Sequence, residues 1–274
     1  MVYPSQRVFW KIGTTFTAEA GGEIVGSNFA VNWGTVGYFG PLIIHPDFRD
    51  QGIAQNLMGP IMETFDEWKT EHVGLFTFSH SPKHLELYRR FGFWPPFLTA
   101  FMSKPVARGA DAEMSSSYTR LPETEKEACL VACRELTDQV YSGLDLTTEI
   151  QALHDHGLGD TVLLWGDVGL DGVAVCHCGL GSEAGETSCL VKFGVVRGGS
   201  NAERDFDRLL DACEAHAAAK GLARLEAGVN LAHQEVYPIM IARGFRTDLQ
   251  GVAMQSGNEA GYHRPGVYLI DDWR

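Results

Sequence analysis

The chain has 274 residues, of which 45% are hydrophobic and 21% charged, and this composition is typical of a globular protein with one large or two ordinary domains. Its 35 acidic residues outnumber its 22 basic ones, and the net charge of −13 argues against a nucleic-acid partner, because phosphate binding needs a basic face. No segment reaches the roughly 18 to 20 uninterrupted apolar residues of a membrane span, and no signal-peptide pattern opens the chain, so we expect a cytoplasmic protein without a membrane partner.

The spacing of apolar residues and turn signals predicts a first αβ unit over residues 1–105. Its predicted elements are strands over 16–19, 24–32 and 36–44, a helix from 52 to 68, a strand over 73–78, a helix over 81–90 and a strand over 97–103. Residues 104–114, with Pro105, Gly109 and several alanines, predict a linker.

A second unit over residues 115–274 repeats this order of elements. Its predicted elements are a strand over 117–121, helices over 123–141 and 147–156, strands over 161–165, 172–178 and 189–196, a helix over 201–220, a strand over 223–229, a helix over 232–243 and two closing strands. The repeat predicts a tandem duplication of α+β domains with αβα layers.

The stretch from Leu42 to Trp68 predicts an anion site. A β-branched run stops at Pro46, a polar loop follows, and Gly52 opens a helix. The first N–H groups of a helix lack partners within the helix and lie at the positive end of its dipole. Gly52 and Ala54 keep this end bare, so that a phosphate can approach the backbone.

Two motifs in this unit resemble those of the GNAT superfamily of acyl-CoA-dependent N-acyltransferases. The hexapeptide from Arg49 to Ala54 resembles the family's Arg/Gln-x-x-Gly-x-Gly/Ala signature, and the run from Tyr88 to Phe93 resembles its Tyr-x-x-x-Gly-Phe. An ordinary β-α turn with small packing residues is the alternative for the hexapeptide alone. The order of strand, anion loop, helix, strand and Tyr-bearing helix favours the family.

The resemblance implies two tandem GNAT-like domains, each a mixed, mostly antiparallel sheet flanked by helices. The first domain lacks the strand and two helices with which the family usually begins, since only about fifteen residues precede its first predicted strand. Either the start is truncated, or another part of the chain or a second subunit walls the acceptor pocket.

The resemblance also implies acetyl-CoA as co-substrate and assigns the cofactor-binding residues to the first domain. These are the strand residues facing the pantetheine arm, the loop residues holding the pyrophosphate, and a serine where the family often has asparagine: Leu42, Ile43, Ile44; Arg49, Asp50, Gln51, Gly52, Ile53, Ala54; and Ser81.

Four further residues are candidates for chemistry and acceptor binding. The resemblance implies that Tyr88 protonates the departing thiolate, although a tyrosine near a helix end also packs its ring in many folds. His80, just past a predicted strand, is our candidate general base, because an amine with a pKa of about 10 must lose a proton before it attacks. Asn28 and Tyr38 are candidates for lining the acceptor pocket.

The second domain differs from the first where chemistry would occur. Aligning its long helix with the first places Arg204, Asp205 and Phe206 opposite the bare loop, where a carboxylate and a large ring would repel and obstruct a pyrophosphate. Met240 falls where the first domain has Tyr88. We therefore expect a degenerate domain that keeps the scaffold and binds no CoA.

The six cysteines predict neither a disulfide framework nor a metal site. Cys176-His177-Cys178 lies in an apolar run, where cysteine is commonly a small buried hydrophobe. We expect no metal.

Together these features predict an N-acetyltransferase that moves an acetyl group to a primary amine, with the first domain catalytic and the second structural or forming the acceptor pocket. Two alternatives stay open: activity in the second domain, as in tandem proteins similar to mycothiol synthase, and a non-catalytic CoA-binding or interaction protein. The acceptor is a small molecule, such as an amine, an aminoglycoside or an amino acid, or a peptide N-terminus. A homodimer is compatible with the resemblance.

Overall fold

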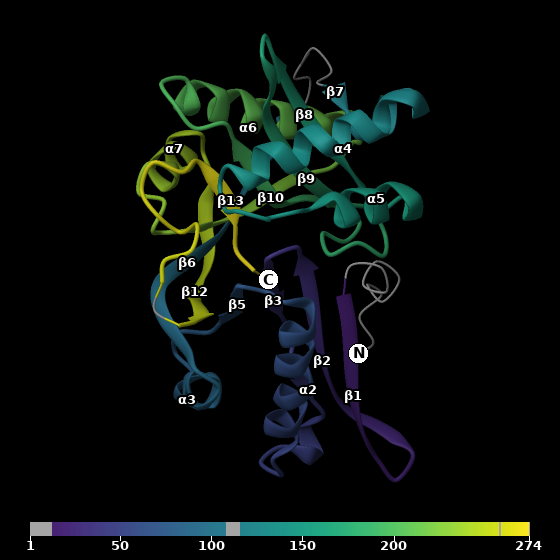
Figure 1. Cartoon of the computed structure of the whole chain (residues 1–274), viewed down its shortest axis with the longest axis vertical. Coiled ribbons are helices and arrows are strands. Elements are labelled where there is room, and N and C mark those ends of the chain that lie inside the picture. The colour runs from purple at the N-terminus through teal and green to yellow at the C-terminus, as the bar shows by residue number, and fades with distance from the viewer. Residues whose placement is uncertain (1–12, 108–115, 258, 274) are drawn as a thin grey trace.

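A computed structural model describes residues 13–107, 116–257 and 259–273 (Figure 1). The first half contains β1 (Gly13–Ala20), β2 (Glu23–Trp33), β3 (Val36–Phe39), β4 (Ile43–Ile44), the short 3-10 helix η1 (Pro46–Phe48), α2 (Ile53–Trp68), β5 (His72–Thr77), α3 (Pro82–Arg90) and β6 (Phe93–Pro105). Among the described residues no helix combines the length and the apolar character needed to cross a bilayer.

The second half is larger. It contains β7 (Ser116–Ser117), the 3-10 helix η2 (Tyr118–Arg120), α4 (Glu123–Asp138), α5 (Thr147–His156), β8 (Gly159–Gly166), β9 (Gly169–Cys178), β10 (Ser188–Val196), α6 (Ala202–Ala219), β11 (Arg224–Asn230), α7 (Val236–Ala242), β12 (Arg246–Ser256) and β13 (Leu269–Asp271). The predicted α+β class with two similar sets of elements is confirmed.

Three predicted strands differ in extent from those observed. The strand expected over 36–44 stops at Phe39, because Pro41 has no N–H to donate to a ladder. The last strand of the first half begins at Phe93 rather than at 97, and Pro95 and Pro96 are accommodated where its register with β12 shifts. The strand expected over 117–121 is mostly the 3-10 helix η2. Of the predicted linker, residues 108–114 lie outside the described residues.

All strands join one sheet of thirteen, and the two halves exchange strands within it. β12 of the second half lies between β5 and β6 of the first, and β6 in turn lies between β12 and β11. Along β6 the pairing is antiparallel with both neighbours, from Thr99 opposite Asn230 to Pro105 opposite Arg224 on the β11 side. The predicted boundary between residues 105 and 115 follows the chain, but the sheet does not divide there.

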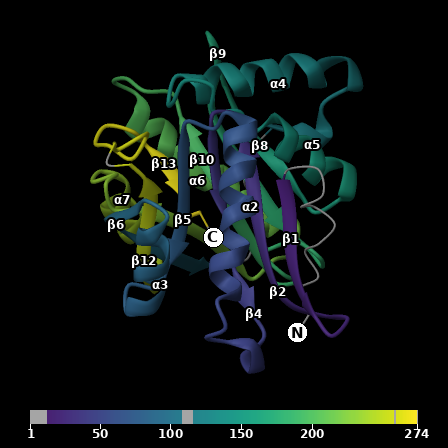
Figure 2. The same ribbon diagram turned by 60° about the horizontal axis from the view of Figure 1, so that its bottom comes forward.

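The core has three parts, and one of them lies between the halves. Helices α2 and α3 cover the outer face of the first half, with Phe39, Phe65 and Phe93 at its centre, and Figure 2 shows α2 crossing this sheet. Helix α6 covers the outer face of the second half. The inner faces share a third cluster that contains Trp33 of β2 and Phe193 of β10, whose ring centroids are 5.6 Å apart. The second half thus covers the inner face of the first.

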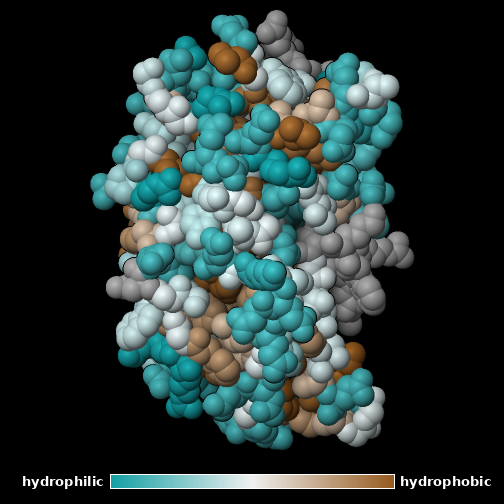
Figure 3. All heavy atoms as spheres, in the orientation of Figure 1, coloured by the Kyte–Doolittle hydropathy of each residue, from teal (hydrophilic) through white to brown (hydrophobic). Residues whose placement is uncertain are grey.

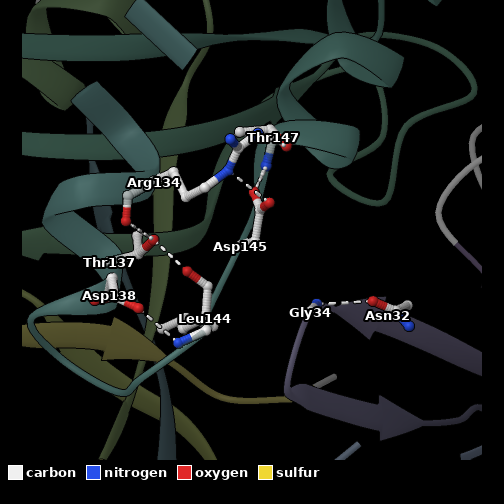
Figure 4. Close-up of polar contacts among 9 residues, drawn as sticks. Asn32, Gly34, Arg134, Thr137, Asp138, Leu144, Asp145 and Thr147 are labelled. Atoms are coloured by element: carbon white, nitrogen blue, oxygen red, sulfur yellow. Dashed lines mark hydrogen bonds and ion pairs between the residues drawn. The ribbon is translucent and has the colours of Figure 1, made fainter. Parts of the chain in front are cut away.

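Backbone hydrogen bonds fix the two halves to each other at the β2–β3 turn. Thr35 N–H donates to the carbonyl of Gly143 over 3.0 Å, and Asp145 N–H donates to the carbonyl of Trp33 over 3.0 Å. The segment that receives this turn is itself held by the Arg134 guanidinium, whose Nε lies 2.9 Å from Asp145 Oδ2 (Figure 4). The halves therefore meet through secondary structure as well as through side chains.

Candidate active site

The loop between β4 and α2 has the bare, left-handed backbone that the sequence predicts. Asp50 and Gly52 have φ values of 64° and 77°, and Gly52 precedes α2 with no side chain capping the helix. No atom lies within 4 Å of where a Cβ on Gly52 would stand. The first helical hydrogen bond runs from Asn56 N–H to the carbonyl of Gly52. The preceding amides therefore lie outside the ladder, at the positive end of a 16-residue helix.

Basic side chains from α3 gather around this loop. The Lys83 ammonium forms an ion pair with Asp50. The pKa of His84 is lowered first by its own burial and then by the positive charges of Lys83, Arg49 and His80, which places these groups near one another. In an acidic chain this concentration of positive charge is favourable for an anion. The sequence motif predicted Arg49 as part of this site but not Lys83 and His84. These two residues lie in the first turn of α3, more than 30 residues further along the chain.

A V-shaped opening between β3 and β5 leads to this loop. The two strands pair in parallel from Val36 opposite His72 to Tyr38 opposite Gly74 and then diverge, because β4 pairs with β2 instead. Backbone groups beyond the last pair are free for a ligand that runs between the strands. The side chains of Ile43 and Phe78 are 40% and 41% exposed, and Figure 3 shows brown surface beside α2 in this lower half.

Of the predicted pantetheine contacts, Leu42 and Ile44 are half-buried and Ile43 is exposed. Leu42 packs against the core under α2. Ser81 is half-buried at the first turn of α3, and its side chain makes no capping hydrogen bond. Its hydroxyl group is thus not committed to capping the helix.

Tyr88 lies at the base of the V on the outer face. Its side chain is 7% exposed, and its ring packs edge-on against Phe39, 5.8 Å away. Phe39 is the first residue of β3 beyond the last pair with β5. Burial raises the pKa of Tyr88 to about 12, so the hydroxyl group keeps its proton at neutral pH and can donate it.

His80 lies in the exposed turn after β5, with its ring 5.6 Å from that of Phe78. His80 lies near His84, because its charge contributes with those of Lys83 and Arg49 to lowering the pKa of His84. Asn28 and Tyr38 are fully buried on opposite faces of the sheet, because Asn28 donates to Met58 Sδ of α2 while Tyr38 belongs to the inner cluster. The structure therefore does not bring these two together in one pocket, since the side chains of a strand alternate between faces.

In the second half the equivalent V is filled by the chain itself. β10 and β11 pair in parallel up to Val191 opposite Ala227 and then diverge. β13 enters the gap, antiparallel to β10 with Phe193 opposite Asp271 and parallel to β11 with Val229 opposite Asp271. The side chains of β13 are at most 1% exposed. No pantetheine arm can enter while this strand is in place.

Helix α6 begins after Asn201, which is exposed, so Asp205 and Phe206 lie within the helix rather than at its start. The Asp205 carboxylate, 4% exposed, accepts hydrogen bonds from Arg204 and Arg208, and the fully buried ring of Phe206 packs against Tyr268 just before β13. Met240 is fully buried at the position that corresponds to Tyr88. The expected alignment of Arg204, Asp205 and Phe206 with the Gly52 loop is wrong, because Asn201 is the residue that precedes α6 as Gly52 precedes α2, and Phe206 packs in the core. Two closing strands were predicted, but the insertion of one of them between β10 and β11 was not.

Two other features do not form a second centre. A cleft of about 650 Å³ lies at the C-terminal end of α2, lined by residues that include Asn32, Trp68 and Arg134. It is separated from the anion loop by the length of α2, about 24 Å at 1.5 Å per residue. Among the described residues no three His, Cys, Asp or Glu side chains could hold a metal ion together. His177 instead contacts Glu149 over 3.0 Å, and its two cysteine neighbours are buried.

Comparison with known proteins finds a family match in the first half. A model of the acetyltransferase (GNAT) family matches residues 3–93. No curated protein matches the chain.

Several solved structures share the fold over most of the chain. A putative acetyltransferase from Pyrococcus horikoshii is 14% identical, with a TM-score of 0.63 over 94% of this chain and 79% of that one. A tandem GNAT protein from the clavulanic acid biosynthesis pathway is 13% identical, with a TM-score of 0.53 over 89% and 83%. A GCN5-related N-acetyltransferase from Sphaerobacter thermophilus is 16% identical, with a TM-score of 0.51 over 89% and 79%. The first part of the chain thus matches the GNAT acetyltransferase family model, and the chain as a whole shares its fold with a tandem GNAT protein.

Proposed function

We propose that this protein is an N-acetyltransferase that uses acetyl-CoA and acts in its first half on a primary amine of a small molecule or a peptide. The observation that carries the proposal is the contrast between the halves: the V between β3 and β5 is open in the first, whereas β13 fills the equivalent gap in the second. A cytoplasmic location is part of this proposal.

The residues of the first half would share the work as follows. The loop amides, with Arg49 and Lys83, hold the phosphates, and the unpaired backbone of the diverging strands holds the pantetheine arm. Acetyl-CoA supplies an activated thioester, so the protein has mainly to orient the amine and manage protons. Tyr88 delivers a proton to the departing sulfur, and His80 is the proposed base. The second half covers the inner face and would form a wall of the acceptor site.

The test is calorimetric titration of acetyl-CoA into the wild type and two matched variants. Gly52→Trp places a ring at the bare helix start, and Asn201→Trp makes the same change at the exposed residue that precedes α6. We expect Gly52→Trp to weaken binding at least tenfold and Asn201→Trp to leave it unchanged. The reverse pattern would move the cofactor to the second half.

Turnover separates an enzyme from a sensor. Release of free thiol from acetyl-CoA is followed with a panel of small amines, aminoglycosides, amino acids and peptides. Acceleration by an acceptor supports the transferase. Tight binding without acceleration by any of these classes would favour a non-catalytic CoA-binding protein.

A further inference from the structure

The last residues of the chain leave the second half and reach the base of the V in the first. After β13, Trp273 lies against Gly74 of β5, where a Cβ would overlap its ring. Figures 1 and 2 both place the C-terminus next to β5. Gly74 is thus needed for close approach rather than for a turn, since without a side chain the strand admits a large ring.

This contact falls where β3 and β5 separate. Gly74 pairs with Tyr38, and this is the last pair before the strands diverge. The rings of Tyr38 and Trp273 belong to the same inner cluster, so they lie over neighbouring positions of the same face. Tyr88 packs against Phe39 on the outer face. A thioester at the base of the V would therefore have the acid on one side and an aromatic wall on the other.

The wall is held in one position. The indole Nε1 of Trp273 donates to the Tyr262 hydroxyl over 2.7 Å, and that hydroxyl bonds to the carboxylate of Asp271. The backbone N–H of Trp273 donates to Asp271 Oδ1 over 3.1 Å. The φ of Trp273 is +51°, a left-handed value that costs a residue with a large side chain energy and persists only where its surroundings fix it. The ring of His263 packs against it, with centroids 4.6 Å apart.

We propose that Trp273 sets the length of the acyl group that the first half accepts, and this inference rests on the proposed function. The side chain of Trp273 is 2% exposed and that of Tyr38 is 1% exposed, so the wall leaves little room beyond the base of the V. A two-carbon acyl group ends before the indole. A longer chain meets a ring that cannot turn aside, because Tyr262 and the backbone hold it. The specificity residue thus comes from the end of the degenerate half.

The test compares the binding of free CoA, acetyl-CoA and hexanoyl-CoA to the wild type, Trp273→Ala and Trp273→Phe by calorimetry. Free CoA has no acyl group and reports the loop and pantetheine contacts alone, so its Kd should be the same in all three proteins. We expect the wild type to bind hexanoyl-CoA at least tenfold more weakly than acetyl-CoA. Trp273→Ala should reduce this ratio at least tenfold, and Trp273→Phe, which keeps a ring, should change it much less.

Each other outcome is informative. An unchanged ratio in Trp273→Ala, or equal binding of both thioesters by the wild type, overturns the role of Trp273. Failure of the wild type to bind free CoA and both thioesters overturns the proposed function instead. If Trp273→Ala does not fold by circular dichroism, Trp273→Leu gives the same measurement with an apolar side chain that fills part of the site.

Discussion

At the scale of single residues, Tyr88 combines a buried ring with a proton that is hard to remove. The pKa of about 12 arises from burial, so the neutral form is the one present throughout the range in which enzymes work. Neutral tyrosine is an acid, and a departing thiolate is a suitable acceptor for its proton. The packing against Phe39 fixes the ring without involving the hydroxyl group.

Replacing Tyr88 with phenylalanine keeps that packing and removes only the hydroxyl group. We expect kcat to fall on the order of 100-fold, as for loss of a general acid, while the Kd of acetyl-CoA stays the same. Because the pKa lies near 12, the wild-type rate should show no loss at alkaline pH that depends on Tyr88 up to about pH 10. The measurement is a pH–rate profile of both proteins. A variant with full kcat would leave Tyr88 as a packing residue.

At the scale of elements, β13 is the main reason why we propose that the second half is inactive, because it fills the gap between β10 and β11. Asp205 and Phe206, by contrast, lie within α6 and leave its start exposed. A short strand buried on both sides also stabilises the protein, because Leu269 and Ile270 are completely inaccessible to solvent.

Truncating Ile270 to alanine tests this role of β13. Truncation of a fully buried isoleucine to alanine lowers the stability of a protein by about 2 to 5 kcal/mol. We expect the free energy of unfolding in urea to fall by that amount. Val168→Ala is the control, since Val168 is 95% exposed and should change stability little. A loss below about 1 kcal/mol would mean that β13 rests loosely in the gap.

The elements also show what sequence patterns reveal and what they do not. The spacing of apolar residues predicted α2, β5 and α5. Each of these elements buries one face or all of its residues, and the resulting pattern of apolar residues can be seen within the element itself. The partners of β6, β12 and β13 were not predictable, since an apolar strand fits next to any other apolar strand. Tyr38 shows the same limit for the site: its position in the strand was expected, but its burial depends on the second half.

At the scale of the whole molecule, strand exchange makes each half incomplete alone. Without β11 and β12 of the second half, one edge of β5 is unpaired and β6 loses both of its neighbours. Unpaired buried strand edges cost free energy and favour aggregation.

We therefore expect residues 1–107 and 116–274 to be unfolded or aggregated when each is produced alone, and to form a folded complex when they are produced together. Circular dichroism and gel filtration of the separate and co-produced fragments measure this. The full chain is the control. A first fragment that folds alone with a cooperative transition would show that the exchanged strands are dispensable.

Buried histidines between the halves make the stability of the whole molecule depend on pH. Burial lowers the pKa of His72 and of His233 to about 4, whereas each has a pKa near 6.5 when unfolded. Below pH 6.5 the unfolded chain takes up protons that the folded chain does not. Each histidine therefore removes about 1.4 kcal/mol of stability per pH unit as the pH falls from 6.5 to 4.

Asp271 acts in the opposite direction. Burial raises its pKa to about 7, so the folded protein keeps a proton that the unfolded chain releases near pH 4, and this contribution to stability is lost as the pH rises toward 7. Between pH 4 and 6.5 the aspartate offsets one of the two histidines. The remaining histidine gives a net slope of about 1.4 kcal/mol per pH unit, and His263, whose pKa is also lowered by burial, adds to it.

We expect the free energy of unfolding in urea to fall by at least roughly 3 kcal/mol between pH 6.5 and 4.5, since His263 adds to the net slope. His72→Phe is the matched variant, because the ring packs near Tyr141 and Trp273 while its Nε2 has no hydrogen-bond partner among the described residues. Phenylalanine keeps these contacts and cannot be protonated, so the slope should decrease by about 1.4 kcal/mol per pH unit. Stability that stays constant or rises as the pH falls would show that these histidines are protonated in the folded protein, and hence that water reaches the cluster beside the base of the V.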